Sequence, residues 1–206
     1  MRVSKERAAA NRQDMLTAAA RRFREQGVSA TGVDAITKDV SLTHGAVYSH
    51  FGSKEAITAE AIRLALQGSK RLWQRLAERK GGEQAFPAIV AEYLSRAHRD
   101  AVGQGCVVAA LGSEIARQPQ SVREAFTEEL KAGLEFLAGL MPGDDPAHRY
   151  EDAIAAFVSM AGALMLARAV NDEPLSERIL DTTAKRVPSN ANVRGRARRT
   201  THGGAA

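Results

Sequence analysis

Apolar residues recur at intervals of three and four along most of the chain, which is the spacing of amphipathic helices. The first such stretch covers residues 11–26, where one face is apolar and arginines occupy the other. The apolar face consists of Met15, Leu16, Ala19, Ala20 and Phe23. Gly27 follows directly, and we expect it to end the helix as a C-cap residue.

Two shorter apolar clusters follow, separated by a break at residues 41–43. Thr31 with Asp34 three residues later predicts a capping-box start for the first helix. The inward residues of this helix are expected to be Val33, Ile36 and Val40. Thr43 can cap the second helix, predicted at residues 43–51, and Ser53 can cap a longer helix that continues through Leu76.

Gly81-Gly82 is the clearest interruption of the remaining pattern. Beyond it, further helices are predicted at residues 86–100, 106–117, 121–140, 147–170 and 175–187. Ser121 and Glu124 predict a second capping box at the third of these helices. The pattern thus indicates about nine helices, no strand and an all-α fold. Residues from 188 onward are mostly Ser, Asn, Arg, Thr and Gly, and their composition predicts a disordered tail.

The composition supports this fold class and adds a charge asymmetry. Hydrophobic residues make up 44% of the chain and aromatics only 5%, with Ala dominant, which favours closely packed helices over a sheet. Residues 1–25 carry seven Lys/Arg against three acids, and residues 185–206 carry six against none. A basic N-terminal segment is what a phosphate-binding module needs, although the same charge can serve solubility alone.

Other sequence features exclude several classes of protein. The single cysteine, Cys106, cannot form an intrachain disulfide and fits a reducing cytosol. We expect a cytoplasmic, nucleoid-associated protein without a membrane partner, because the chain has neither a signal-peptide pattern nor about 18 uninterrupted apolar residues. The five histidines show no ligand spacing, and no phosphate loop or nucleophile motif occurs, so we expect no metal, no cofactor and no enzyme activity.

The two short helices and their turn are the arrangement that presents a helix end to the DNA major groove. Packing of Ile36 and Val40 on Val47 and Phe51 would leave the leading side of the second helix outward. The DNA-binding residues predicted from this side and its flanks are Thr31, Thr43, His44, Gly45, Tyr48, Ser49, His50 and Lys54. Thr43, His44 and Gly45 are expected to face bases, because a glycine permits close approach. Tyr48, His50 and Lys54 are expected to hold phosphates, and Thr31 can add a hydroxyl.

The run from Ile36 to Glu55 resembles the signature of TetR-type regulators, with Tyr-x-His-Phe at 48–51, Ser-Lys-Glu at 53–55 and Gly27 in register. It departs from that signature at Thr37, and at Val40 and Ser41, where the family has a small residue and a glycine. The resemblance implies a three-helix helix-turn-helix domain (11–71) and a ligand-binding and dimerisation domain (72–188). Charge and composition add a basic arm (1–10) and a disordered basic tail (189–206). It also implies a homodimer that binds a near-palindromic double-stranded DNA operator and represses until a small-molecule effector binds.

The predicted C-terminal domain carries two candidate features. Small residues line the helix at 147–170, which with the last helix is assigned to a four-helix dimer interface, although it can also be an intrachain core helix. The predicted ligand pocket consists of Trp73, Phe86, Tyr93, Cys106, Met160 and Met165.

Three alternatives stay open at this point. Cys106 is either a redox or electrophile sensor, because a helix N-terminus favours the thiolate, or a small core residue. The arginines at 194–199 either add non-specific DNA affinity or only solubilise the tail. The whole chain is either a DNA-binding regulator or a helical ligand-binding and protein-interaction module without specific DNA binding.

Overall fold

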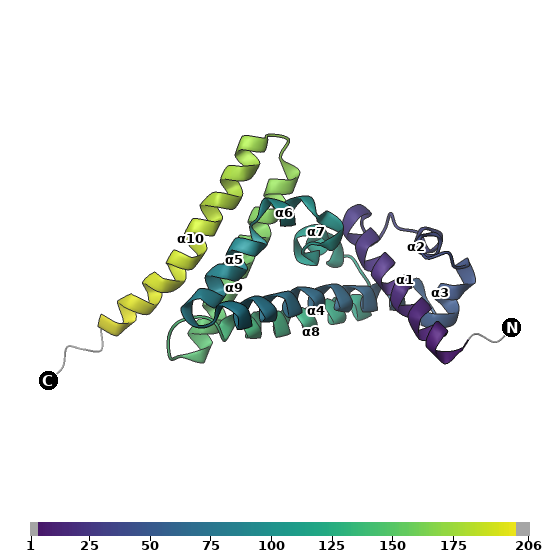
Figure 1. The fold of residues 1–206 in the computed structure, drawn as a ribbon, viewed down its shortest axis with the longest axis horizontal. Coiled ribbons are helices and arrows are strands. Elements are labelled where there is room, and N and C mark those ends of the chain that lie inside the picture. Colours follow the sequence, from purple (N-terminus) through teal and green to yellow (C-terminus); the bar gives the residue numbers. More distant parts are fainter. Residues whose placement is uncertain (1–3, 201–206) are drawn as a thin grey trace. The chain divides into compact units, whose positions relative to one another are not determined.

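The computed structural model describes the backbone of residues 4–200 and the side chains of residues 4–187. Within these limits the chain forms helices and no strand, which confirms the all-α prediction (Figure 1). The helices are α1 (Lys5–Gln26), α2 (Val33–Asp39), α3 (His44–Phe51), α4 (Lys54–Lys80), α5 (Ala85–Tyr93), α6 (Arg96–Asp100), α7 (Val107–Ile115), α8 (Gln120–Ala138), α9 (Pro146–Ala169) and α10 (Glu173–Thr200). Short 3-10 turns at Gly82–Gln84 and Val102–Gln104 precede α5 and α7.

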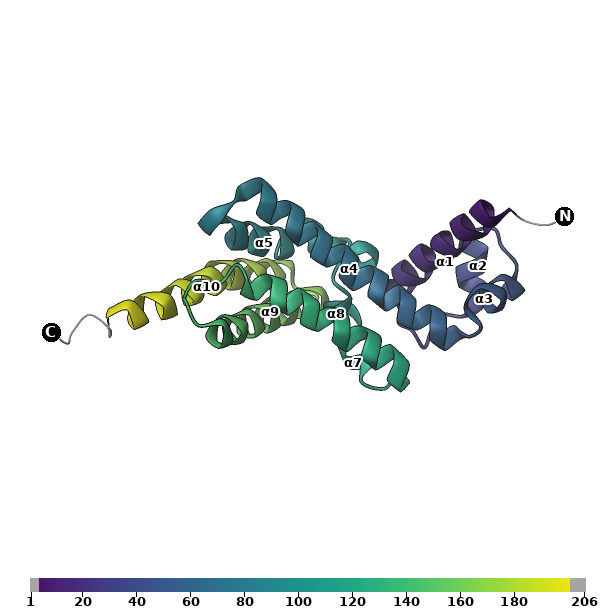
Figure 2. The same ribbon diagram turned by 90° about the horizontal axis from the view of Figure 1, so that it is seen from below.

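The described residues divide by their contacts into two compact units. The first unit contains residues 1–69 and 102–130, so it holds α1, α2 and α3 together with α7 and the first part of α8. α2 and α3 lie on one side of α1 in both ribbon views (Figures 1 and 2). One apolar core joins these helices, and its most deeply buried members include Met15, Phe23, Ile36, Val47, Ile57, Ile62 and Leu111.

The second unit contains residues 70–101 and those from 131 onward. In it α9 and α10 are consecutive helices that pack on each other (Figure 2). Its buried residues include Trp73, Phe86, Ile89, Tyr93, Phe157, Met160, Leu164 and Leu180. Among the described residues, α9 is the one helix long and apolar enough to cross a membrane, but a core helix meets the same criteria and 44% of its apolar window is buried.

Several predicted helix starts were wrong. Residues 5–10 form the first turns of α1 instead of an arm, because Ser4 caps the helix by accepting a hydrogen bond from the Arg7 N–H at 3.2 Å. Gly32, not Thr31, is the N-cap of α2. The capping box at Ser121 is absent, because that hydroxyl donates to Glu55 of α4 instead.

The helix predicted at 86–100 is divided, and the last helix is longer than predicted. Ser95 accepts a hydrogen bond from the His98 N–H at 3.1 Å and so caps α6 separately from α5. The backbone of α10 continues to Thr200, where the sequence analysis expects a disordered tail. The Ala and Arg residues of this stretch have high helix propensity, which favours a helix over a disordered chain. The side chains of residues 188–206 lie outside those described, and a DNA contact by this tail stays a prediction.

Candidate nucleic-acid interface

The crossing of α2 and α3 is fixed by apolar packing. Ile36 of α2 and Val47 of α3 are fully buried in the core of the first unit. Val40, Leu42 and Phe51 are partly buried and pack against the same core. The predicted contact surface between the two short helices is therefore confirmed.

The turn between these helices is a Schellman motif. The Leu42 N–H donates to the Thr37 carbonyl at 2.9 Å, and the Ser41 N–H donates to the Lys38 carbonyl at 3.3 Å. Ser41 has φ 55°, and it is the one non-glycine residue with positive φ among those described. This is the position where the TetR-type signature has glycine, and a serine there accepts a left-handed backbone at a conformational cost.

Charged side chains of α1 also contact these two helices. Asp39, at the end of α2, forms ion pairs with Arg21 and Arg22. The hydrogen bond from Arg22 outweighs partial burial and holds the pKa of Asp39 below its usual range. Arg12 lies 4.7 Å from the ring centroid of Phe51 and donates to Glu60 of α4 at 2.6 Å. The position of α3 is thus set by packing and by arginines from α1.

The leading face of α3 is free of these contacts. Thr43, His44, Gly45, Tyr48 and Ser49 are all exposed, whereas Val47 between them is buried. The Thr43 hydroxyl makes no cap hydrogen bond, and the Tyr48 side chain is 46% exposed. A Cβ placed on Gly45 would meet nothing within 4 Å, so the helix surface is open at this point. These residues can contact a partner without disturbing the core.

The remaining predicted contact residues are placed less favourably. His50 and Lys54 are half-buried, with Lys54 at the start of α4. Thr31 is fully buried, and its hydroxyl donates to the Gly27 carbonyl at 2.7 Å. The prediction that Thr31 contacts DNA is wrong, because its side chain turns inward to satisfy the end of α1.

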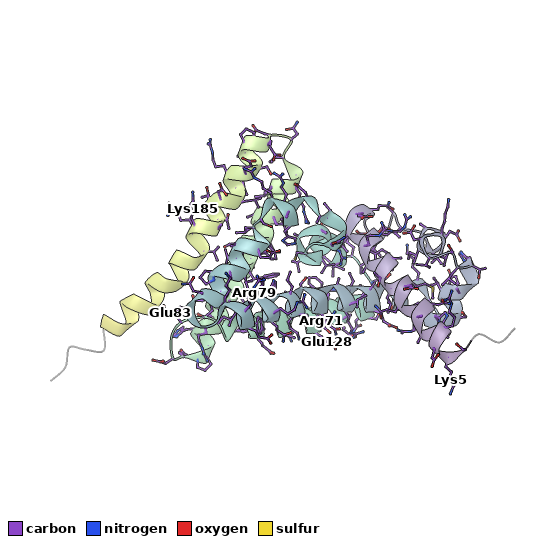
Figure 3. All side chains as sticks on the ribbon, viewed as in Figure 1. Lys5, Arg71, Arg79, Glu83, Glu128 and Lys185 are labelled. Atoms are coloured by element: carbon purple, nitrogen blue, oxygen red, sulfur yellow. The ribbon has the colours of Figure 1, made fainter. Side chains whose placement is uncertain are left out.

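Sequence reasoning missed several residues beside this face. Asp34 of α2 forms a hydrogen-bonded pair with His44, and Lys38 is exposed on the same helix. Lys5 and Arg7 are exposed in the first turns of α1, and Figure 3 shows Lys5 pointing away from the helices. The helical register of α2 could have indicated Lys38, but the Asp34–His44 pair depends on how α2 and α3 cross.

The turn after α1 is anchored by Glu114 of α7, which sequence reasoning also missed. Its carboxylate accepts hydrogen bonds from the N–H groups of Val28 at 3.0 Å and Ser29 at 2.7 Å. Burial raises the pKa of Glu114, but the hydrogen bonds from Ser29 and Val28 outweigh burial and leave the pKa below its usual range. Arg24 similarly donates to the Gly103 carbonyl at 2.8 Å. Segments about 80 residues apart in sequence are therefore joined at the base of the helix-turn-helix.

The predicted ligand pocket is brought together only in part. Trp73, Phe86, Tyr93 and Met160 are buried in the second unit, where the Trp73 and Tyr93 ring centroids are 6.4 Å apart. Two aromatic residues outside the predicted set join them, Phe157 at 5.8 Å from Trp73 and His98 at 4.8 Å from Tyr93. Met165 is 49% exposed, and the buried Cys106 belongs to the first unit.

Comparison with known proteins agrees with this arrangement. The sequence model for bacterial regulatory proteins of the tetR family matches residues 15–61. An uncharacterised HTH-type transcriptional regulator from Mycobacterium tuberculosis is 25% identical over 169 residues, which cover 78% of this chain and 86% of the relative. The HTH-type transcriptional regulator UidR of Escherichia coli is 33% identical over 109 residues, which cover 53% of this chain and 54% of UidR. The crystal structure of a TetR-family regulator from Agrobacterium tumefaciens matches with a TM-score of 0.74 at 16% identity, covering 89% of this chain and 98% of that one. Residues 15–61 therefore carry the sequence pattern of bacterial regulatory proteins of the tetR family, and the chain shares its fold with a solved TetR-family regulator.

Proposed function

We propose that this protein is a homodimeric repressor that binds a near-palindromic operator through α3 and leaves it when a small molecule binds. The observation that carries the proposal is the leading face of α3, which is exposed while the residues beneath it are buried. Two such helices in successive major grooves would lie about 34 Å apart. Thr43, His44 and Gly45 would face bases, and Tyr48, His50 and Lys54 would contact phosphates.

The proposed dimer uses α9 and α10. Large apolar side chains that soluble monomers usually bury are exposed on these helices, namely Ile154, Val158, Met165, Leu166 and Leu175. Val158 is 64% exposed near the exposed small residues Ala155 and Ser159, which permit close packing of a partner helix. The small residues Ala156, Ala163 and Ala167 are instead buried within the chain. The exposed stripe fits a two-fold four-helix interface with a second copy.

The proposed effector site lies among Trp73, Phe86, Tyr93 and Met160, which share one unit. The aromatic contacts there favour an apolar or aromatic molecule. Such an effector releases DNA only if it binds the non-DNA-binding conformation more tightly. Met165 is left out of this site because half of it is exposed, and Cys106 because it belongs to the other unit.

The test begins with the full chain and a library of randomised DNA duplexes, from which bound sequences are selected at physiological salt. We expect enrichment of a near-palindrome whose half-sites lie about one helical turn apart. Removing the phenolic hydroxyl with Tyr48→Phe should weaken binding about fivefold, the effect of one lost hydrogen bond of about 1 kcal/mol. Tyr150→Phe, the same change on α9, should leave affinity unchanged. If no sequence is enriched, the chain is better explained as an interaction module without specific DNA binding.

Effector binding can be measured separately. Trp73 is the only tryptophan in the sequence, so its fluorescence reports on the proposed site directly. Molecules that dissociate the selected duplex should also change this fluorescence. A molecule that dissociates DNA without affecting Trp73 would place the effector site elsewhere.

A further inference from the structure

The imidazole of His44 is held by two neighbours. Its Nδ1 lies within hydrogen-bonding distance of Oδ1 of Asp34, which is ten residues earlier and on the other helix of the motif. One turn further along α3, the centroid of the Tyr48 ring lies 5.2 Å from that of the imidazole, with the planes tilted by 38°. The His44 side chain is nevertheless 54% exposed. The ring therefore has a preferred orientation while it remains accessible from outside.

The pairing also selects a tautomer. An ionised carboxylate only accepts hydrogen bonds, so the Nδ1 that faces Asp34 must carry the proton. In a neutral imidazole the outer nitrogen, Nε2, is then an acceptor. In the major groove such an acceptor matches the amino groups of cytosine N4 or adenine N6, and it does not match the O6 and N7 acceptors of guanine.

The two acidic residues of α2 differ in where they face. Asp39 is paired with Arg21 and Arg22 of α1, and its side chain is only 17% exposed. Asp34 is 82% exposed and its carboxylate meets the first turn of α3. An exposed carboxylate beside a DNA-binding helix repels phosphates and weakens binding. Because Asp34 weakens phosphate binding, its presence here needs a compensating role. Its pairing with His44 of the leading face provides one.

We infer that Asp34 is a specificity-determining positioning residue, which holds His44 as the Nδ1–H tautomer so that Nε2 accepts a hydrogen bond from cytosine or adenine. The inference rests on the proposed function, because it requires α3 to face bases. Asp34 itself contacts no base and acts through His44. Its removal should therefore change which base is preferred, in addition to any change in overall affinity.

The experiment uses the full chain and the randomised duplex library at pH 8, followed by duplexes that vary one base pair at a time. His44→Ala should relax the preference about tenfold at one base pair of each half-site, where the wild type selects cytosine or adenine on the contacted strand. Asp34→Ala should relax the same position to a similar extent, and the double variant should add nothing further. Asp34→Asn, whose amide oxygen can still accept from Nδ1, should retain part of the preference. Asp14→Asn, at an exposed carboxylate of α1, is the matched control, and it should leave the preference unchanged.

Three outcomes would overturn the inference while leaving DNA binding intact. The first is that Asp34→Ala binds every duplex more tightly by the same factor, which would mean that Asp34 only repels phosphates. The second is that His44 and Asp34 affect different base pairs, and the third is that the shared position selects guanine. If the wild type enriches no sequence, the proposed function fails first and the inference fails with it.

A second readout does not depend on DNA. Nitrogen NMR of ¹⁵N-histidine-labelled protein distinguishes the two neutral tautomers, and the His44 signal can be assigned from its loss in His44→Ala. We expect the Nδ1–H form in the wild type and in Asp14→Asn, and a shift toward the Nε2–H form in Asp34→Ala. A wild-type His44 in the Nε2–H form would contradict the inference directly.

Discussion

Gly45 lies in the first turn of α3, on the face proposed to approach DNA, and its substitution by alanine separates folding from binding. A Cβ at this position would meet nothing within 4 Å, so Gly45→Ala creates no steric conflict in the protein. Alanine is favoured over glycine in helices by up to about 1 kcal/mol, with the smaller values near helix ends. The variant should therefore be as stable as the wild type or slightly more stable. A gain of this size would raise Tm by about 2–4 °C in a chain of this length.

The same methyl group should weaken DNA binding. If the backbone at Gly45 comes into van der Waals contact with base edges, a methyl group must displace the helix from the groove. Loss of one well-placed base contact costs about 1–3 kcal/mol, which corresponds to a reduction in affinity of about 5-fold to 150-fold. The expected signature is an unchanged or higher Tm together with a Kd at least fivefold larger.

Thermal unfolding and fluorescence anisotropy with the selected duplex would measure the two quantities on the same sample. Gly112→Ala is the matched control, because Gly112 lies within α7 and its Cβ would meet only Val108 Cγ1 at 4.0 Å. The control should gain stability without losing affinity. An unchanged Kd for Gly45→Ala would refute the proposal that this part of α3 enters the groove.

Three further changes test other parts of the structure. Ser41→Gly should stabilise the protein by about 0.5–1 kcal/mol, because it relieves a left-handed serine at φ 55°. The greater conformational freedom of glycine in the unfolded chain offsets part of this gain. Denaturant titration measures the change in the free energy of unfolding. Glu114→Gln should destabilise the protein by about 1 kcal/mol at pH 7, because the ionised carboxylate accepts from Val28 and Ser29. Its folded pKa is lowered, so this contribution is present above the unfolded pKa and is lost as pH falls below about 4.5 through the folded value. Val158→Glu should weaken the dimer at least 100-fold, measured by light scattering, because it buries a charge in an apolar interface.

Each of these expectations has a specific contrary result. If Ser41→Gly is less stable than the wild type, the Ser41 side chain stabilises the fold by more than its left-handed backbone conformation destabilises it. The wild type and Glu114→Gln should differ less in their free energy of unfolding at pH 4 than at pH 7. If the difference is equally large at pH 4, the ionised carboxylate is not its cause. A Val158→Glu protein that remains dimeric would exclude the exposed face of α9 as the interface.

Local patterns predicted the elements around the candidate site well. The spacing of Ile36, Val47 and Tyr48 placed two side chains inside and one outside, and the structure confirms it. This works because helical geometry alone assigns neighbouring residues to opposite faces once the core side is known. The same reasoning failed at Ser95, because its side chain caps α6 and so begins a second helix within the single helix predicted at residues 86–100.

By itself, the sequence determined that the chain is helical, where its short second and third helices lie and which side of α3 is polar, since all three depend on residues within a few positions of one another. Only the tertiary structure decided that Asp34 meets His44 and that Glu114 holds the turn at Val28. These contacts depend on how helices cross and on side chains up to 86 positions apart, which no local periodicity encodes. The leading face of α3 was thus predictable as a surface, whereas the groups that orient it were not.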